Sequence, residues 1–491
     1  MYGPRKKVWW FAITSRIIII FLQFVFNFLC SDHDADAFSS PRNPREKHSI
    51  FDNVITFLFE GLTRWDAQYL IHIAKYGYTY ENTLAFFPLY PMTIRCIAML
   101  VRIVFFVLND HSVIVLTAIG INLIFFIKSA VILFDLSLNV LKDVSLAYKA
   151  TILYCLNPAS IFFSAAYSES MFAYLTFRSM LASVENNPYI SLPLSLSTLV
   201  RSNGLTNLGF PVYNWVKSMM NTAVPNFVSE YKYYSSKWSI IFDFRHIYLS
   251  ICQIVTVVLL SIVPFCLFQI YNYSKFCIPQ ANVTDLPPYI VHYSIENNLV
   301  LPGSIQLPWC DLAIPIAYSS VQERYWNVGF MRYYQIKQIP QFLLAFPILY
   351  IMLKFNIKFL KEHRRNLVNL SFFKTKEKNE NTVKTFYPLS MFPFVIHSLF
   401  LTCFCIFIVH IQISTRLLAS ASPVMFWYCA FALSYKSKSS EFDELNNLHS
   451  KWKVFLLTQK KYSKSDIFIL SYFLSYIVIG TFMFSNFLPW T

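Results

Sequence analysis

Charged residues are scarce in this chain. Asp, Glu, Lys and Arg make up 14% of its 491 residues, whereas soluble domains carry about 25%. Glycine is also scarce, with nine in the whole sequence, and no internal repeat is evident. The low charge excludes an ordinary soluble domain. Instead, 56% of the residues are hydrophobic and the mean hydropathy is +0.45, which indicates a membrane protein.

Long apolar runs supply the expected membrane spans. About eleven segments are apolar over the roughly 20 residues that a helix needs to cross the hydrocarbon layer. None shows the alternation of apolar and polar residues that is typical of a transmembrane barrel. The sequence therefore predicts an all-α polytopic membrane protein, one membrane domain over residues 1–491. The expected spans lie near residues 8–30, 88–108, 112–134, 147–165, 170–186, 191–213, 248–271, 341–357, 388–411, 415–435 and 467–488.

The basic residues predict how the chain is oriented. The formal net charge is +15, and its lysines and arginines gather at the tip MYGPRKK and in the loops 358–387 and 436–466. Loops rich in Lys and Arg stay in the cytoplasm, so we expect the N-terminus and both loops to be cytoplasmic. This placement explains the surplus charge without a nucleic-acid partner. Arg16, inside the first span, is expected to reach toward the cytoplasmic headgroups.

Counting spans outward makes residues 31–87 and 272–340 the two sizeable lumenal loops. The second contains the glycosylation sequons of Asn272 and Asn282. It also contains Cys277 and Cys310, which we expect to form a disulfide in an oxidising compartment. The ten cysteines lack the spacing of a zinc site, and most are expected to be buried thiols.

The first lumenal loop carries the clearest chemistry. Apolar residues recur at helical spacing between residues 58 and 73, which predicts a helix on the membrane surface. On this helix, Asp66 could act as a general base for a hydroxyl group, and the ring of Trp65 is a platform for a sugar. Equally, Asp66 could serve the helix dipole or form a salt bridge with Arg64.

Six blocks of sequence show a resemblance to a known family. They are RWDAQYLIHIAKYGYTYENTLAFFPLYP at 64–91, LNPASIFFSAAYSESMFA at 156–173, RSNG at 201–204, PWC at 308–310, YWNVGFMRYYQIKQIPQFLLAFP at 325–347 and HIQISTRLLASASP at 410–423. These blocks closely resemble the GPI mannosyltransferase 2 (PIG-V) family, in the same order and over most of the chain. Only the two basic loops look unlike that family.

The resemblance implies a GT-C glycosyltransferase of the endoplasmic reticulum with a lumenal active site. It would transfer the second mannose, in α1,6 linkage, from dolichol-phosphate-mannose to the monomannosylated GPI precursor. The donor mannose is β-linked to phosphate, so an α product requires inversion, which needs one base and no nucleophilic carboxylate. The acid of such enzymes stands in the first lumenal loop. Asp66 would be the base, with Trp65 as its neighbour at the sugar.

Aromatic residues of the same loop would line a wall that contacts the sugar and the isoprenoid. They are Trp65, Tyr69, Tyr76, Tyr78, Tyr80, Phe86 and Phe87.

A metal is not expected. Asp34 and Asp36 form an Asp-x-Asp pair that could suggest a metal-bound nucleotide-sugar site, but a lipid-phosphate donor brings no diphosphate that demands one. We expect no cofactor, and help from a divalent cation stays open. His33 is expected to be a solvated loop residue.

Arg201 lies inside an expected span, where a charge is costly unless paired. It is either a clamp on the dolichyl phosphate or the partner of Glu169. Span counting places Glu169 toward the cytoplasmic side, which argues against catalysis unless residues 150–186 form broken half-helices. Asn203 is a further binding candidate from the RSNG block.

The remaining candidates could hydrogen-bond the acceptor glycan or a phosphate, or simply pack within their loops. They are Arg64, Gln322, Arg324, Tyr325, Trp326, Asn327, Arg332 and Arg416. The rival functions are a lipid or solute transporter or scramblase, and a non-catalytic subunit that assists a transferase. Transporters tend to show internal repeats and interrupted helices, so the scarcity of glycine and the one-sided polar clusters favour a lipid-surface enzyme. An accessory subunit stays open.

Overall fold

The computed structural model describes residues 2–229, 237–278, 286–304, 306–364, 367, 386–433 and 462–490. These residues form seventeen α-helices joined by short 3-10 turns, which confirms the all-α prediction. The helices are α1 Tyr2–Leu29, α2 Ile50–Phe59, α3 Asp66–Tyr76, α4 Leu89–Val104, α5 Asp110–Leu141, α6 Val144–Cys155, α7 Glu169–Val184, α8 Ser191–Val200, α9 Gly209–Ser229, α10 Lys237–Phe276, α11 Pro288–Glu296, α12 Ala317–Trp326, α13 Ile339–Glu362, α15 Phe392–Phe407, α16 Ser414–Ala421, α17 Val424–Ala432 and α19 Lys464–Ser485.

Six of the described helices are long and apolar enough to span a membrane, namely α1, α5, α10, α13, α15 and α19. This supports a polytopic membrane protein but does not give the eleven spans expected from the sequence. The other expected segments are shorter or broken: α7 has 16 residues, and Pro423 divides the segment 415–435 into α16 and α17. At 1.5 Å per residue, α7 reaches only about 24 Å. A hydropathy window joins apolar residues across such breaks, which explains the difference.

The centre of the bundle is α5, against which α1, α4, α6 and α7 pack. Buried small and polar residues let these helices approach closely. On α5 itself, Ser129 is bonded to the hydroxyl of Tyr154 at 2.6 Å, and Ser137 accepts a hydrogen bond from the indole of Trp427 at 2.7 Å. The framework around the centre is therefore specified by polar contacts as well as by apolar packing.

The chain is not α-helical between α6 and α7, where Pro158 and a short 3-10 helix separate the two. Backbone groups in such a break must find partners inside the protein. Arg16 of α1 donates to the carbonyls of Ser160 at 2.6 Å and Cys155 at 3.1 Å. Asn122 of α5 donates to the carbonyl of Tyr167 at 3.0 Å. Side chains from two neighbouring helices thus satisfy the backbone carbonyls of the break.

Arg16 does not reach toward the headgroups as expected. It is 1% exposed, also bonds the hydroxyls of Ser160 and Ser164, and has its guanidinium 3.9 Å from the centre of the Phe126 ring. The reason is local: the end of α6 presents unpaired carbonyl groups, which carry the negative end of the helix dipole. These acceptors replace the water that a snorkelling side chain would seek.

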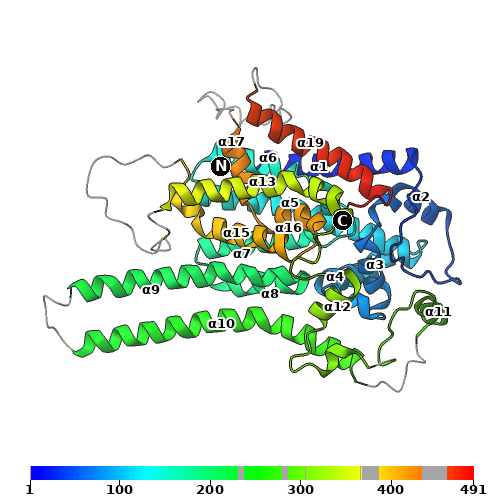
Figure 1. Ribbon diagram of the computed structural model, residues 1–491, viewed down its shortest axis with the longest axis horizontal. Coiled ribbons are helices and arrows are strands. Elements are labelled where there is room, and N and C mark those ends of the chain that lie inside the picture. Colours follow the sequence, from blue (N-terminus) through cyan, green and yellow to red (C-terminus); the bar gives the residue numbers. More distant parts are fainter. Residues whose placement is uncertain are drawn as a thin grey trace.

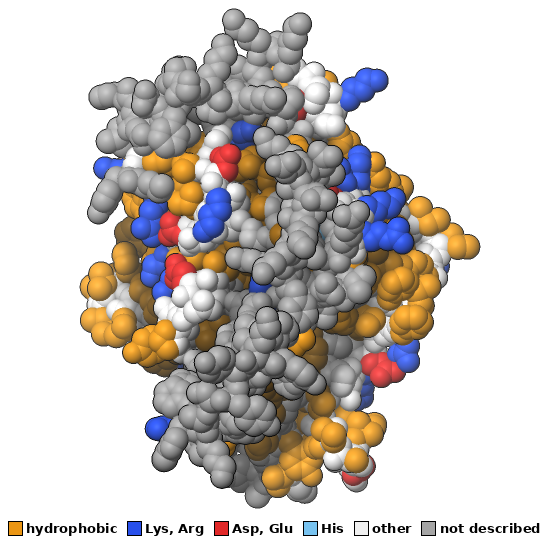
Figure 2. Space-filling view, turned by 90° about the vertical axis from the view of Figure 1, so that its left-hand side faces the viewer, with side chains coloured by type: hydrophobic (Ala, Val, Ile, Leu, Met, Phe, Trp, Pro, Cys, Tyr) orange, Lys and Arg blue, Asp and Glu red, His pale blue; other side chains and the backbone are white. Residues whose placement is uncertain are grey.

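The two ends of the bundle differ. Figure 1 shows α2, α3, α11 and α12 gathered at one end, while α9 and α10 run side by side toward the other. That other end, seen in Figure 2, carries Lys and Arg side chains scattered among hydrophobic ones. Apart from their edges, the basic loops 358–387 and 436–466 lie outside the described residues. The sequon residue Asn282 lies outside them as well.

Candidate active site

A cavity of about 590 Å³ brings together parts of the chain that are far apart in sequence. Its wall is formed by residues 36–38, α3 with its preceding residue, residues 85–87, the start of α7, the turn after α8, α12 with residues 328–329, and the segment 404–417. Most of the charged and aromatic candidates from the sequence meet here. The cavity is large enough for sugar-sized groups, since ligand sites are typically about 300–1,000 Å³.

Asp66 enters the cavity because of an unusual backbone turn before α3. Trp65 has φ 56° and ψ −127°, a positive-φ conformation that is rare and costly for a bulky residue. The turn places Trp65 and Asp66 together in the cavity wall. The backbone N–H of Asp66 donates to the hydroxyl of Tyr167 at 3.0 Å, which ties the start of α3 to the break before α7. As the first residue of α3, Asp66 also interacts favourably with the helix dipole.

Glu169 is the second acid of the cavity. It is the first residue of α7, as Asp66 is of α3, and it is fully buried. Span counting had placed it toward the cytoplasmic side unless the chain were broken nearby. The break between α6 and α7 is present, and it brings Glu169 into the same cavity as Asp66.

Arg416 joins the two acids. Its Nη2 donates to Asp66 Oδ2 at 2.6 Å, and its Nη1 lies 3.5 Å from Glu169 Oε1. The side chain is 8% exposed, and the guanidinium lies over the rings of Phe162 and Tyr167. Because Arg416 faces a carboxylate on each side, it fixes the spacing of the two acids.

Arg201 closes the charged cluster from the other side. It is the residue after α8, where a cation complements the helix dipole, and its Nη1 pairs with Glu169 Oε1. Gly204 explains the local sequence: a Cβ there would lie 2.6 Å from the backbone of Ser197, so only glycine permits this close turn. The turn also brings Asn203 to the cavity, where its buried Nδ2 has no hydrogen-bond partner among the described residues.

An aromatic wall accompanies the charges. Phe38 stacks on Tyr69 with 4.2 Å between ring centroids, and Tyr69 stacks on Phe86 at 4.7 Å. Trp326 of α12 meets the edges of both Tyr69 and Phe86. Tyr69 follows Asp66 by three residues on the same face of α3, so these rings lie beside the acid. Burial, followed by the charge of Asp66, raises the pKa of the Tyr69 phenol, which therefore stays protonated.

The wall is smaller than the sequence suggested. Phe87 lines the cavity as expected, but Tyr76, Tyr78 and Tyr80 do not. Tyr78 donates to the carbonyl of Phe86 at 2.8 Å and Tyr80 to that of Ile290 at 2.9 Å, so both rings help to fold the loop. Burial lowers the pKa of the nearby His72 to about 3, and this neutral ring adds no positive charge beside the cavity.

Glu81, in the first loop (31–87), bonds several residues of the second loop (272–340). Sequence reasoning missed this residue. Glu81 is fully buried, with Oε1 accepting from the Trp309 indole at 3.0 Å. Its Oε2 accepts from Arg324 at 3.0 Å and from the hydroxyl of Tyr325 at 2.8 Å. The only signal in the sequence was an acid within the Tyr-rich run of the first block.

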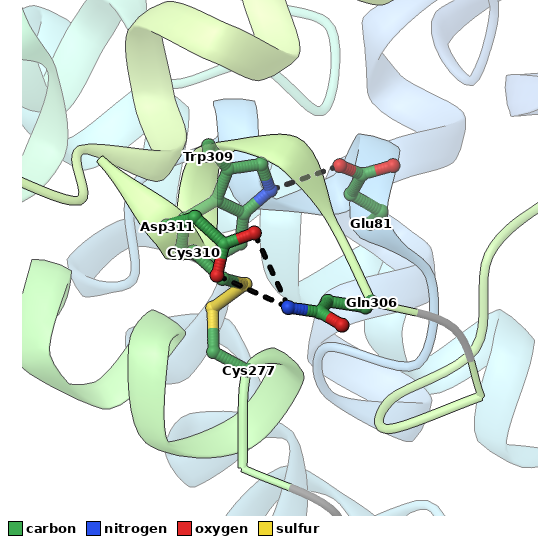
Figure 3. Close-up of a disulfide and its surroundings, with 6 residues drawn as sticks. All are labelled: Glu81, Cys277, Gln306, Trp309, Cys310 and Asp311. Carbon is green, nitrogen blue, oxygen red and sulfur yellow. Dashed lines mark hydrogen bonds between the residues drawn. A yellow bond between two sulfur atoms is a disulfide. The ribbon is translucent and has the colours of Figure 1, made fainter.

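A disulfide lies beside these hydrogen bonds of Glu81. Figure 3 shows Cys277 joined to Cys310, next to Trp309, whose indole points at Glu81. The predicted pair is thus confirmed. It ties the end of α10 to the segment that precedes α12, which supplies Gln322 and Trp326 to the cavity wall.

Several candidates lie elsewhere. Arg64 does not line the cavity and pairs with Asp32 at 2.6 Å, and the partner of Asp66 is Arg416 instead. Tyr325 is bonded to Glu81. Asn327 ends α12 in the left-handed conformation that Asn tolerates, and it does not line the cavity.

The sequon residue Asn272 is also not where a glycan acceptor would be expected. It lies inside α10 and is fully buried, so the folded chain does not present its side chain to solvent.

The described part of the chain holds no cluster of three or more His, Cys, Asp or Glu side chains that could bind a metal ion. Asp36 does line the cavity, whereas Asp34 and His33 do not. Tyr167 is a further residue that sequence reasoning missed, although the block SAAYSES contains it. It lines the cavity between the two acids and bonds the start of α3.

Comparison with known proteins covers the whole chain. A family model described as mannosyltransferase (PIG-V) matches residues 5–491. A Drosophila melanogaster protein named GPI mannosyltransferase 2 is 33% identical over 99% of this chain and 100% of its own length. A Homo sapiens protein named GPI alpha-1,6-mannosyltransferase 2 is 31% identical over 99% of each. No solved structure matches the chain.

Proposed function

The chain belongs to the mannosyltransferase (PIG-V) family, and from this membership we propose that it is a GPI α-1,6-mannosyltransferase. The donor is dolichol-phosphate-mannose, and the acceptor is a mannosyl-glucosaminyl-phosphatidylinositol, which receives its second mannose. The observation that carries the proposal is the cavity in which Asp66 and Arg201 meet beside stacked aromatic rings. Transfer of a sugar from phosphate to a hydroxyl needs a base, a cation and a surface for the sugar.

The reaction is a single displacement. The acceptor hydroxyl oxygen attacks the anomeric carbon of the donor mannose on the face opposite the phosphate. As this bond forms, the bond from carbon to the phosphate oxygen breaks, and its electron pair leaves with dolichyl phosphate. The hydroxyl proton passes to Asp66. One displacement converts the β-linked donor into an α-linked product without a covalent intermediate.

Asp66 is better placed than Glu169 to be the base. The side chain of Asp66 is 23% exposed, whereas that of Glu169 is fully buried. Arg416 binds Oδ2 of Asp66 and leaves Oδ1 for the acceptor hydroxyl. Glu169 instead anchors Arg201 and Arg416, which gives it a positioning role.

The phosphate of the donor binds Arg201 in this proposal. Arg416 is engaged by two carboxylates and is 8% exposed, whereas Arg201 is 18% exposed and pairs with Glu169 alone. The guanidinium of Arg201 therefore has donors left for phosphate oxygens, and it can stabilise the charge that develops on the leaving group.

Orientation in the membrane follows the same proposal. We place the chain in the endoplasmic reticulum with the cavity on the lumenal side and the N-terminus in the cytoplasm. The disulfide between Cys277 and Cys310 supports a lumenal second loop, because disulfides persist in oxidising compartments. Lys and Arg on the opposite end of the bundle support a cytoplasmic face there (Figure 2).

The proposed function predicts a defined lipid defect. Cells that lack the protein should accumulate GPI precursors with a single mannose, and purified protein should convert that precursor in the presence of dolichol-phosphate-mannose. Mass spectrometry of extracted lipids and linkage analysis of the product measure both. Precursors that stall before the first mannose, or a product with another linkage, would contradict the proposal.

Arg201→Lys should raise the KM for dolichol-phosphate-mannose by roughly tenfold, because Lys keeps the charge but loses the two-pronged donor. The effect on kcat should be smaller. Initial rates at varied donor concentration measure it. Arg332→Lys is the control, since Arg332 forms an exposed pair with Glu323 and does not line the cavity. If the donor KM is unchanged in Arg201→Lys, Arg201 does not bind the donor phosphate and its role is the structural ion pair with Glu169.

A further inference from the structure

The charges that line the cavity do not balance. Among Asp, Glu, Lys and Arg they are Arg201 and Arg416 against Asp36, Asp66 and Glu169. The two arginines and two of the acids are paired with one another, as described above. Asp36 is left over: it is exposed, and it forms no ion pair among the described residues. Two positive charges against three negative ones leave one negative charge on the wall.

Asp36 is held at the wall by its neighbours in sequence. Phe38, two residues later, lines the cavity and stacks on Tyr69 of α3. The backbone N–H of Ser39 donates to the Tyr293 hydroxyl at 3.1 Å, and that of Ser40 to Gln68 Oε1 at 3.1 Å. Contacts to α3 and α11 thus fix this stretch although it has no helix of its own. The position of Asp36 follows from these contacts.

A fixed, accessible and unpaired carboxylate beside aromatic rings suits a ligand that carries a cation on a sugar. The proposed acceptor has such a group, because glucosamine bears a primary amine that is protonated at neutral pH. We propose that Asp36 binds the ammonium group of the acceptor's glucosamine and makes the enzyme select acceptors whose amine is free. This inference rests on the proposed function and adds a specificity-determining residue to it.

The proposed position of the ammonium group also gives the two substrates different charged partners. Arg201 supplies positive charge for the donor phosphate, and Asp36 supplies negative charge for the acceptor amine. These residues come from different parts of the chain, the turn after α8 and the loop before α2. An acceptor held by its amine presents its mannose to Asp66, while the donor is held by its phosphate. The charges thereby disfavour binding of either substrate in the place of the other.

The test compares two synthetic acceptors, mannosyl-glucosaminyl-inositol phospholipid and its isostere with a hydroxyl in place of the amine. Purified full-length protein, dolichol-phosphate-mannose and either acceptor give kcat/KM values. Wild type should prefer the amine by roughly fivefold, mainly through KM, because a charge pair at an exposed site is at most of that order. Asp36→Asn should lose this preference. Asp34→Asn is the matched control, since it removes the same charge two residues away and outside the cavity wall.

The outcomes separate the inference from the function on which it rests. Transfer to both acceptors without preference in wild type would overturn the role of Asp36 while leaving the mannosyltransferase activity intact. A preference that survives in Asp36→Asn would overturn it too. Equal loss of activity on both acceptors in Asp36→Asn, with loss of wild-type activity in a chelator, would show a metal role and overturn the ammonium contact. Absence of transfer to either acceptor by folded wild type would instead contradict the proposed function.

Discussion

Asp66→Asn should lower kcat by about 10²- to 10⁴-fold, the usual contribution of general-base assistance. Asn can accept the hydrogen bond from Arg416 at nearly the same position, so the variant should fold and reach the membrane. It should not take the acceptor proton. Single-turnover rates with saturating donor and acceptor measure the loss, and cells that carry only this variant should accumulate the precursor with one mannose.

Two comparisons make the result specific. Asp66→Glu keeps the carboxylate but moves it by roughly 1 Å, which can itself cost on the order of 10²-fold, so partial rescue is the most we expect. Glu169→Gln should act mainly on donor KM and stability, because this buried residue anchors two arginines. Asp66→Asn protein that transfers mannose at a near wild-type rate would contradict the assignment. The base would then be sought at Glu169 or Asp36, the other acids of the cavity wall.

Arg416→Met should destabilise the fold by roughly 3–5 kcal/mol, because removing one partner from a buried ion pair leaves the other charges uncompensated. Met is of similar length and leaves no large void, so the loss reports charge. Glu169 is fully buried and would keep only Arg201, and Asp66 would lose its ion-pair partner. We expect a lower thermal unfolding midpoint for the purified protein and less protein in the membrane.

Arg332→Met is the matched control for this prediction. Its partner Glu323 and Arg332 itself are both about half exposed, and such surface pairs contribute about 0–1 kcal/mol. The two variants make the same substitution and differ in burial. If Arg416→Met unfolds at the wild-type temperature, the cluster of two acids and two arginines does not stabilise the fold in the way described.

The sequence was a good guide to residues that act close to their own position. The apolar spacing predicted one helix over residues 58–73, and the structure has α-helix there except at residues 60–65, where a 3-10 turn and the backbone turn at Trp65 separate α2 from α3. The pair Cys277 and Cys310 was predicted from their isolation in one polar loop. In both cases the deciding neighbours lie nearby in the chain or share one loop. Hydrophobic spacing and loop composition register such features directly.

Partners that are distant in sequence were not predictable in the same way. The sequence offered the adjacent Arg64 as a possible salt-bridge partner of Asp66, but the partner is Arg416, 350 residues away. Span counting allowed Glu169 near the active site only if residues 150–186 were broken, and the apolar residues around Pro158 hide that break from a sequence pattern. Arg16 bonds the backbone carbonyls of Ser160 and Cys155 as well as serine hydroxyls. Every residue has a carbonyl and serines are common, so no pattern of side chains could identify these partners.

Arg16 also has a consequence for synthesis of the chain. It belongs to the first helix, but its acceptors are 139 to 148 residues further on. At about 5–20 residues per second, a ribosome needs roughly 7–30 s to make that stretch. During this interval the nascent first helix carries an unsatisfied guanidinium, which costs about 2.5–3.5 kcal/mol at the centre of a membrane. The hydrogen bonds of Arg16 can form only after residues 155–164 have been made, so α1 cannot reach its final packing against the break between α6 and α7 before then.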